Sequence, residues 1–223
     1  MKIGVIGGTG GQGLGIAVRF AQAGEDVIIG SRTVDKAQAA ADKVKAVLGD
    51  SVSVRGAENL DAAKEADILV LTVPLPAQKS TLLSIKEATA GKPLLDATGP
   101  LEATIGGSPT KYISLPDGSA AQRSQAILPG AKVICAFNNI SEHCLMAVDG
   151  EIDCDCLICG NDKEAKAFVT PVIEKIPGVR VIDCGGLERA CIIEKITPLL
   201  IGLNIRNKSQ FGGIRITGLD KGK

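Results

Sequence analysis

The chain has almost no aromatic residues and no excess of either charge. Of its 223 residues one is Tyr, four are Phe and none is Trp, so the core is expected to consist of Ile, Leu, Val and Ala. Lys plus Arg and Asp plus Glu number 25 each, which leaves no electrostatic argument for binding nucleic acid or an anionic membrane. The expected partners are therefore small molecules.

Long apolar runs are absent as well. No run reaches the ~18 residues that a membrane span requires, and the first residues already have the pattern of a buried strand, so neither a membrane anchor nor a signal peptide is expected. Seven cysteines without a secretory signal indicate reduced thiols. These features together predict a cytoplasmic protein.

Three of the cysteines lie close together in the segment IDCDCLICG, which has the pattern of a short strand. On a strand, Cys154 and Cys156 share one face, whereas Cys159 points to the other. Thiolates divided in this way cannot complete a tetrahedral zinc site, and the single His143 is not in ligand spacing. We therefore expect buried, small hydrophobic side chains here and no metal.

The most informative stretch is KIGVIGGTGGQGLG, residues 2–15. A short apolar strand precedes Gly8, Gly10 and Gly13 in G-x-G-x-x-G register, and the apolar run from Leu14 opens a helix. Gly8 is expected to permit the turn, Gly10 the approach of a pyrophosphate, and Gly13 the packing of the helix on the strand. Such a motif alone also fits a flexible loop. The strand and helix around it predict a dinucleotide site at a helix N-terminus.

The end of the second predicted strand, DVIIG, indicates which dinucleotide binds. Domains that bind NAD carry an acidic residue about 20 residues past the glycines, where it accepts the ribose 2′-hydroxyl. Here that place holds Ser31 and Arg32, with Lys36 one helical turn further on. A carboxylate would repel a 2′-phosphate, whereas these side chains bind one through charge-assisted hydrogen bonds. The prediction is NADP; the alternative is a solvated helix start at which the cations bind nothing.

Strand-like and helical patterns alternate along the chain and predict an α/β fold, a Rossmann-type doubly wound parallel sheet. Three predicted strands, ADILVLTVP, PLLDATGP and AKVICAF, end in prolines, small residues or amides. Ligands of doubly wound folds bind at these carboxyl ends. Asn138 and Asn139 follow the last of the three strands and are predicted to position a polar heterocycle, although Asn is also a common turn former.

Two parts of one molecule are expected. Residues 1–150 are predicted to form the NADP-binding Rossmann domain, and residues 151–223 a smaller C-terminal α/β lobe that closes the cleft. The lobe ends in a long apolar helix in which Pro198 is expected to introduce a kink or a division. The apolar stretch from Leu199 to Leu203 is the expected contact of a homodimer or higher homo-oligomer. The irregular segment 101–114 is interpreted either as part of the site or as a surface loop.

Several segments together resemble one family. GGTGGQG, SR with Lys36, LTVP, AFNNIS and GLERACIIEKITPLLIGLNIRN are similar to the archaeal and bacterial reductases that pass a hydride between NADP and the deazaflavin coenzyme F-420. The similarity spans essentially the whole chain. The oxidoreductase domain of eukaryotic membrane metalloreductases shares the architecture and an FN-x-I-S segment, but those proteins carry transmembrane helices.

The resemblance implies a role for residues in each part of the site. The residues implied to shape and hold the NADP phosphates and adenosine ribose are Gly8, Thr9, Gly10, Gly11, Gln12, Gly13, Ser31, Arg32 and Lys36. Those implied to line the path to the nicotinamide are Thr72, Val73, Pro74, Ala97, Thr98 and Ala136, and those implied near the deazaflavin are Asn138, Asn139, Ile140 and Asn207. Some relatives have a His at the position of Asn138, and His143 is too far along the chain to replace it by default.

The resemblance also implies direct hydride transfer between the nicotinamide C4 and the deazaflavin C5. The coenzymes supply the chemistry, so no catalytic side chain is implied, only positioning that holds the two carbons roughly 3 to 3.5 Å apart. Small residues such as Ala97, Gly99 and Ala136 suit this close approach.

Two other functions stay open from the sequence. A hydroxyacid dehydrogenase or imine reductase shares the N-terminal fold but continues into a long helical domain with a catalytic Lys or Asp, for which Lys195 is the one candidate here. A short-chain dehydrogenase is excluded, because Tyr112 is the only Tyr and is followed by Pro116 instead of the Lys of Y-x-x-x-K. A regulatory module that senses NADP needs no space for a tricyclic ring beyond the nicotinamide.

Overall fold

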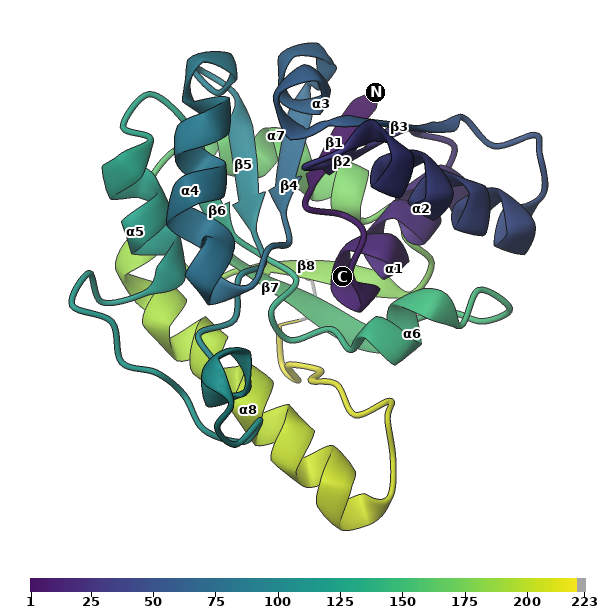
Figure 1. Ribbon diagram of the computed structural model, residues 1–223. Coiled ribbons are helices and arrows are strands. Elements are labelled where there is room, and N and C mark those ends of the chain that lie inside the picture. Colours follow the sequence, from purple (N-terminus) through teal and green to yellow (C-terminus); the bar gives the residue numbers. More distant parts are fainter. Residues whose placement is uncertain (220–223) are drawn as a thin grey trace.

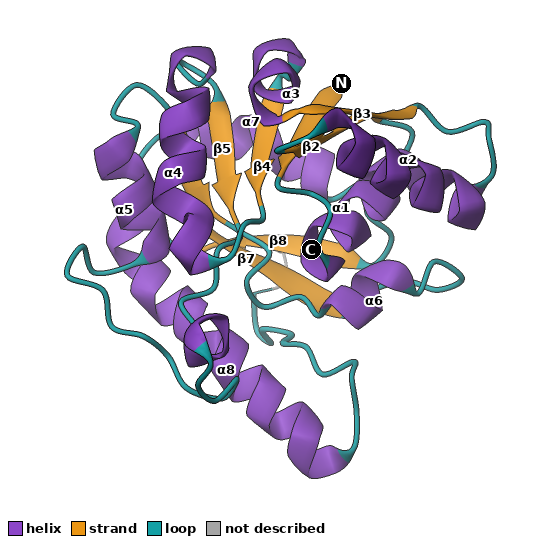
Figure 2. Ribbon diagram, viewed as in Figure 1, coloured by secondary structure: helices purple, strands orange, loops and turns teal. Residues whose placement is uncertain are grey.

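The computed structural model describes residues 1–219, which contain one eight-stranded sheet with helices on both faces (Figures 1 and 2). The strands lie in the order β3-β2-β1-β4-β5-β6-β7-β8. Their bounds are β1 Lys2–Ile6, β2 Asp26–Ser31, β3 Val54–Glu58, β4 Ile68–Leu71, β5 Pro93–Asp96, β6 Lys132–Cys135, β7 Cys154–Gly160 and β8 Val179–Asp183. The helices are α1 Gly11–Gln22, α2 Val34–Leu48, α3 Asn59–Glu65, α4 Leu75–Ile85, α5 Ala120–Ile127, α6 Glu142–Met146, α7 Lys163–Ile173 and α8 Ala190–Asn207, with short 3-10 turns η1 Lys86–Ala88, η2 Glu102–Ile105 and η3 Leu187–Arg189.

Strands β1 to β6 are parallel, and the predicted Rossmann-type α/β class is confirmed. Each strand is short and all except β3 are mostly buried, and a helix returns the chain to the same end of the sheet before the next strand begins. The chain order reverses between β1 and β4, which lie side by side although β2 and β3 come between them in the sequence. A doubly wound sheet binds ligands at this reversal.

The sheet is mostly parallel, with one antiparallel pair that the sequence did not indicate. Ile134 of β6 lies opposite Gly160 of β7 in antiparallel register, and β8 then runs parallel to β7. The connection from β6 to β7 contains only the five-residue helix α6. Because no full crossover helix carries the chain back across the sheet, β7 runs in the opposite direction.

Two hydrophobic cores cover the two faces of the sheet. Helices α1, α2, α6 and α7 pack on one face, where the rings of Phe20 and Phe137 meet edge to face at 6.0 Å. Helices α3, α4, α5 and α8 pack on the other face. Side chains of Cys154 and Cys156 lie in the first core and that of Cys159 in the second, so their predicted division between faces is confirmed. Burial raises the pKa of Cys156 to about 12, as expected of a packing residue.

The last helix, α8, runs from Ala190 to Asn207 as one element with Pro198 inside it, so of the expected kink or division the division does not occur. Ile193 before the proline and Leu200 after it are both buried, and this packing holds the two halves in one helix. No helix within residues 1–219 combines the length and apolarity needed to cross a membrane. The final residues of the predicted lobe, 220–223, lie outside the described part of the chain.

Candidate functional site

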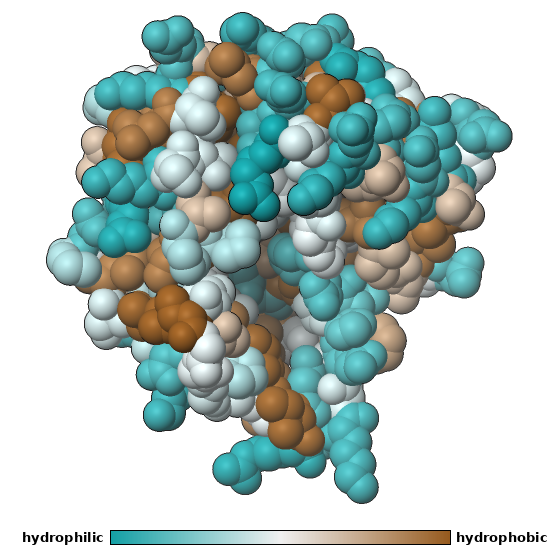
Figure 3. Space-filling view, viewed as in Figure 1, coloured by the Kyte–Doolittle hydropathy of each residue, from teal (hydrophilic) through white to brown (hydrophobic). Residues whose placement is uncertain are grey.

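A cleft of about 830 Å³ opens at the carboxyl ends of β1, β4, β5 and β6, and Figure 3 shows this face hollowed near its centre. Helix α8 forms one side of it and the N-terminus of α1 the other. The lining residues are Gly7, Thr9, Gly10, Gly11, Gln12, Thr72, Val73, Pro74, Ala97, Gly99, Leu101, Thr104, Asn138, Asn139, Ile140, Ser141, Glu142, His143, Thr197, Leu200, Ile201, Asn204, Ile205, Ser209, Gln210 and Gly212.

The glycine loop at the start of α1 is shaped by close contacts. A Cβ atom on Gly13 would lie 2.7 Å from the Cα of Gly8, so only glycine permits this packing of helix and loop. A Cβ on Gly10 would meet nothing within 4 Å, which leaves open space beside the first turn of α1. The positive φ of the turn, 71°, belongs to Gly7 and not to Gly8. The amide of Gly8 instead donates to the carbonyl of Gly30 on β2.

Two cations lie beside this loop at the end of β2. Ser31 is buried at the strand end, whereas Arg32 and Lys36 are exposed. Within residues 1–219 neither cation forms a hydrogen bond or ion pair with another side chain. Thr33 precedes α2 without a side-chain cap on the helix N-terminus. Two available cations at an uncapped helix start match the chemistry of a phosphate monoester.

The two predicted amides reach the lining, but their side chains bind protein. Asn138 Nδ2 donates to the carbonyl of Thr98 at 3.2 Å. Asn139 Nδ2 donates to the carbonyl of Asp155 at 2.6 Å, and its Oδ1 accepts the amide of Leu157 at 3.2 Å. The side chain of Asn139 therefore fastens the end of β6 to β7, which leaves the backbone of this segment to face the cleft.

The α8 side of the cleft contains an amide that the sequence argument missed. Asn204 lies in the lining, and its Oδ1 accepts the amide of Gly212 at 2.9 Å. The predicted Asn207 lies one turn further on, is exposed and donates to the carbonyl of Leu203 at 2.8 Å. Both side chains lie on nearby faces of α8, and sequence spacing alone does not fix the rotation of a helix finely enough to choose between them.

Residues 208–216, named here the strap, leave α8 and run along the cleft to β7. Ser209, Gln210 and Gly212 of the strap line the cleft. Ser141 Oγ donates to the carbonyl of Gln210 at 2.7 Å, which ties the strap to the start of α6. No sequence pattern indicates this segment, because the contacts that place it along the cleft, with Ser141 and Asp155, are with residues far away in the chain.

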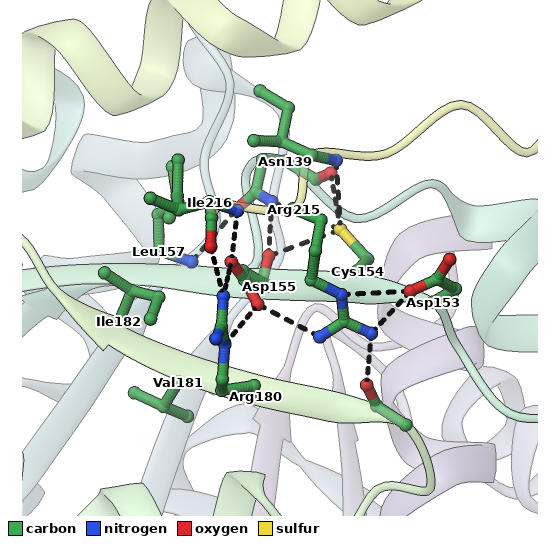
Figure 4. A network of polar contacts seen from close by, with 12 residues as sticks. Asn139, Asp153, Cys154, Asp155, Leu157, Arg180, Val181, Ile182, Arg215 and Ile216 are labelled. Carbon is green, nitrogen blue, oxygen red and sulfur yellow. Dashed lines mark hydrogen bonds and ion pairs between the residues drawn. The ribbon is translucent and has the colours of Figure 1, made fainter. Parts of the chain in front are cut away.

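The far end of the strap is fixed by the fully buried carboxylate of Asp155 on β7 (Figure 4). Arg180 donates to both oxygens of Asp155 at 2.9 and 2.8 Å, Arg215 donates at 3.0 Å, and the amide of Ile216 donates at 2.7 Å. Burial alone would raise the pKa of Asp155, but these hydrogen bonds outweigh it and lower the pKa to about 2. The strap is therefore held at this end by an ionised side chain.

A second buried carboxylate fixes α8 itself. Glu194 accepts the amides of Ala120 and Ala121 at the start of α5, at 3.0 and 3.1 Å, and the hydroxyl of Tyr112 at 3.1 Å. Burial raises the pKa of Glu194 to about 7, against the opposing effect of these hydrogen bonds. Glu194 thus joins α8, α5 and segment 101–114, and Leu101 of that segment lines the cleft.

Two polar residues after the FNNIS segment also lie in the lining. Glu142 begins α6, and its carboxylate lies against Gly11 at the start of α1. His143 follows it and is exposed in the cleft. The sequence argument set His143 aside because of its distance along the chain, whereas the turn into α6 brings it back to the site.

Comparison with known proteins identifies the family. A family model described as "NADP oxidoreductase coenzyme F420-dependent" matches residues 2–100. The F420-dependent NADP reductase of Methanothermobacter marburgensis is 55% identical over 98% of this chain and 99% of its own length. The chain belongs to this family of coenzyme F-420-dependent NADP oxidoreductases. The resemblance inferred from the motifs is thereby confirmed.

Two further comparisons agree. A crystal structure from Arthrobacter sp. FB24, assigned as an F420-dependent NADP reductase, matches with a TM-score of 0.83 and 28% identity over 97% of this chain and 99% of that one. Metalloreductase STEAP3 of Rattus norvegicus is 26% identical over 90% of this chain but only 37% of its own length, which agrees with the second, more distant resemblance.

The cleft brings together eleven of the residues that the resemblance implied, which are Thr9, Gly10, Gly11, Gln12, Thr72, Val73, Pro74, Ala97, Asn138, Asn139 and Ile140. Four others, Gly8, Gly13, Thr98 and Ala136, are buried outside the lining. Ser31, Arg32 and Lys36 lie outside it at the end of β2, and Asn207 lies outside it on α8.

Proposed function

We propose that this protein transfers a hydride reversibly between NADP(H) and the deazaflavin coenzyme F-420. The observation that carries the proposal is a single cleft of about 830 Å³ in which the glycine loop faces the apolar side chains of α8. Family membership supports the same activity. If a dinucleotide extends from the glycine loop, the α8 end of such a cleft still has room for a second flat ring.

In this proposal residues 1–150 bind NADP. The free backbone N–H groups at the start of α1 donate hydrogen bonds to the pyrophosphate. Ser31, Arg32 and Lys36 hold the 2′-phosphate through charge-assisted hydrogen bonds. The nicotinamide lies along the carboxyl end of β4. There Thr72 Oγ1 donates to the carbonyl of Ile6 at 3.2 Å and holds the ends of β4 and β1 together.

Residues 151–223 in turn supply the wall that faces the deazaflavin. Leu200, Ile201 and Ile205 of α8 line the cleft with apolar surface. Asn138, Asn139 and Ile140 after β6 and the small residues Ala97 and Gly99 line the same cleft. Such a lining suits two flat rings that approach face to face, which is the geometry that direct hydride transfer needs.

The alternative functions receive less support. Lys195, the one candidate for a catalytic Lys, lies over the ring of Tyr112 at 5.3 Å and is absent from the cleft lining. Residues 151–219 form β7, α7, β8 and α8 instead of a long helical domain. A protein that only senses NADP has no use for a cleft that continues past the nicotinamide path to α8.

We propose further that the protein is a cytoplasmic homo-oligomer that contacts its copies through α8. Ile192, Leu199 and Leu203 are 54%, 56% and 44% exposed on this helix, although all three are large and apolar. All seven cysteines are free thiols, as a reducing compartment favours. Size-exclusion chromatography with light scattering should give an oligomer for the native chain and a smaller species for Leu203→Glu.

The activity is tested directly by mixing the purified protein with NADPH and oxidised coenzyme F-420. Loss of the deazaflavin's visible absorbance is followed, with NADH and FMN as parallel substrates. We expect turnover with NADPH and coenzyme F-420 and a much lower rate with NADH. Binding of NADPH without turnover of coenzyme F-420 would favour a sensor or a dehydrogenase of another substrate.

A further inference from the structure

One side chain of the glycine loop points away from the expected phosphate position and toward the other half of the site. Gln12 lies in the first turn of α1, and its Nε2 donates to the carbonyl of Phe137 at 3.1 Å and to the carbonyl of Ile140 at 3.3 Å. These carbonyls begin and end a turn of four residues after β6, named here the platform turn, 137–140. A primary amide has two N–H donors, so both are used on this turn.

The platform turn requires such support. Phe137 has a φ of 66°, a left-handed conformation that bulky residues seldom adopt, and its ring is fully buried beside Phe20. The amide of Ile140 donates to the carbonyl of Phe137 at 3.2 Å and closes the turn. Thr197 of α8 donates to the carbonyl of Asn138 at 2.6 Å. Neighbouring elements thus hold a strained backbone in place.

Gln12 joins this turn to the start of the helix assigned to the pyrophosphate, whereas the ring contact of Phe137 with Phe20 joins it further along α1. The backbone of Gln12 belongs to the first turn of α1, whereas its side chain fixes carbonyls beside Asn138 and Ile140 in the cleft lining. Any shift of the turn relative to α1 lengthens these two hydrogen bonds. Gln12 therefore helps to set the distance between the two coenzyme positions at the glycine-loop end of α1.

We propose that Gln12 is a positioning residue for hydride transfer, which acts by fixing the platform turn and not by binding the NADP phosphates. The inference rests on the proposed function, since it assigns the platform turn to the deazaflavin. Positioned reactions are sensitive to small displacements, and an error of about 1 Å can cost on the order of 100-fold in rate. The side chain touches neither reacting carbon in this account.

The first test is Gln12→Met, which keeps the length of the side chain and removes both donors. We expect kcat/KM for coenzyme F-420 to fall roughly 10-fold or more, while the Kd for NADP, measured by titration calorimetry, stays within about twofold. The matched control is Gln22→Met at the other end of α1. Gln22 Nε2 donates to the carbonyl of Val148 at 3.0 Å, and neither residue lines the cleft. This control should leave both quantities unchanged.

The second test is Gln12→Glu, because its carboxylate accepts but does not donate at neutral pH and regains one donor when protonated. Its activity, relative to the native protein, should rise as the pH is lowered, whereas the activity of Gln12→Met should stay low at every pH. A residue that only stabilised the fold would give no such difference between the two pH profiles.

Hydrogen exchange of residues 137–140 supplies a measurement that needs no turnover. Exchange of the Ile140 amide should be faster in Gln12→Met than in the native chain and unchanged in Gln22→Met. Equal exchange in all three proteins overturns the proposal, as does an NADP Kd that weakens by the same factor as kcat/KM. If hydrogen exchange differs between the three proteins as expected but the native protein does not reduce coenzyme F-420, the proposed function is contradicted. The role of Gln12 in fixing the platform turn is then still supported.

Discussion

The glycine loop and the wall formed by α8 and the strap face each other across one cleft, but the chain builds them in different ways. The loop occupies residues 7–13 and depends on neighbours in the sequence and on two adjacent strands. The opposite wall is fixed by two buried carboxylates, Asp155 and Glu194, each of which accepts hydrogen bonds from residues more than 20 positions away. One side is local and open, whereas the other is assembled by tertiary contacts.

This difference predicts two kinds of mutational effect. Exposed groups on the glycine-loop side have few partners in the protein, so changing them should alter ligand affinity with little loss of stability. Buried groups of the opposite wall hold other elements, so changing them should lower stability first and affect the coenzyme F-420 step through the displaced wall.

The largest effect is expected from Asp155→Asn. It removes the ionised partner of Arg180 and Arg215 and should cost about 3 kcal/mol or more of unfolding free energy. The melting temperature, measured by calorimetry, should fall by roughly 5–10 °C, and KM for coenzyme F-420 should rise because the strap lines the cleft. Asp153→Asn is the control, since Asp153 also pairs with Arg215 but is 91% exposed. An equal loss in both variants would contradict the role given to Asp155.

Gly13→Ala should disturb the glycine loop directly. Its Cβ would lie 2.7 Å from the Cα of Gly8 and 2.5 Å from Thr72 Oγ1, which forces the loop to shift. Overpacking of this kind costs about 1–3 kcal/mol, and NADP affinity should fall roughly 5- to 100-fold. In Gly10→Ala the added Cβ meets nothing within 4 Å, so this variant should keep the native melting temperature but bind NADP more weakly. Native affinity for NADP in Gly10→Ala would place the pyrophosphate elsewhere.

Arg32→Ala should reduce the preference of the protein for NADPH over NADH. Loss of a charge-assisted hydrogen bond costs about 1.5–3 kcal/mol, so KM for NADPH should rise roughly 10- to 100-fold. KM for NADH, which lacks the 2′-phosphate, should not change, and neither should the melting temperature. Arg55→Ala serves as the control, because Arg55 is exposed on β3 and pairs with Glu65. A parallel loss with NADH would show that Arg32 supports the loop instead of the phosphate.

The smallest effect is a pH dependence from Glu194. Its pKa is raised to about 7 in the folded protein from an ordinary value of 4.5, so the folded state binds the proton more tightly. Stability from this group is complete below pH 4.5 and is lost as the pH rises through 7. The stability difference between the native protein and Glu194→Gln should shrink by on the order of 2 kcal/mol from pH 5 to pH 8. Chemical denaturation at both pH values measures it, and a constant difference would contradict the raised pKa.

The same contrast explains how much was predictable from the sequence. The glycine register and the cations after β2 are local patterns, and the structure places the glycines at the start of α1 and the cations at the end of β2. The strap and the carboxylates that fix the wall have no local pattern, because their roles depend on which residues the fold places beside them. The side-chain amide of Asn139 was predicted to face a ligand, but it forms hydrogen bonds with the backbone of Asp155 and Leu157 on β7.

Residues of the second wall were predictable only to within a helical turn. The resemblance implied that the tail near Asn207 belongs to the site, yet the lining contains Asn204 in place of Asn207. The antiparallel direction of β7 likewise follows from a short connection whose path is decided by packing. His143 reached the site through that same connection.

The central claim is that both walls hold their coenzymes in one cleft, close enough for direct hydride transfer. It is tested most directly with NADPH carrying deuterium on the transferred C4 position, by mass spectrometry of the reduced coenzyme F-420 formed in ordinary water. The account predicts that the deuterium is recovered on the deazaflavin C5. Loss of the label to water would contradict it, because the hydrogen would then have passed through an exchangeable group between two separated sites.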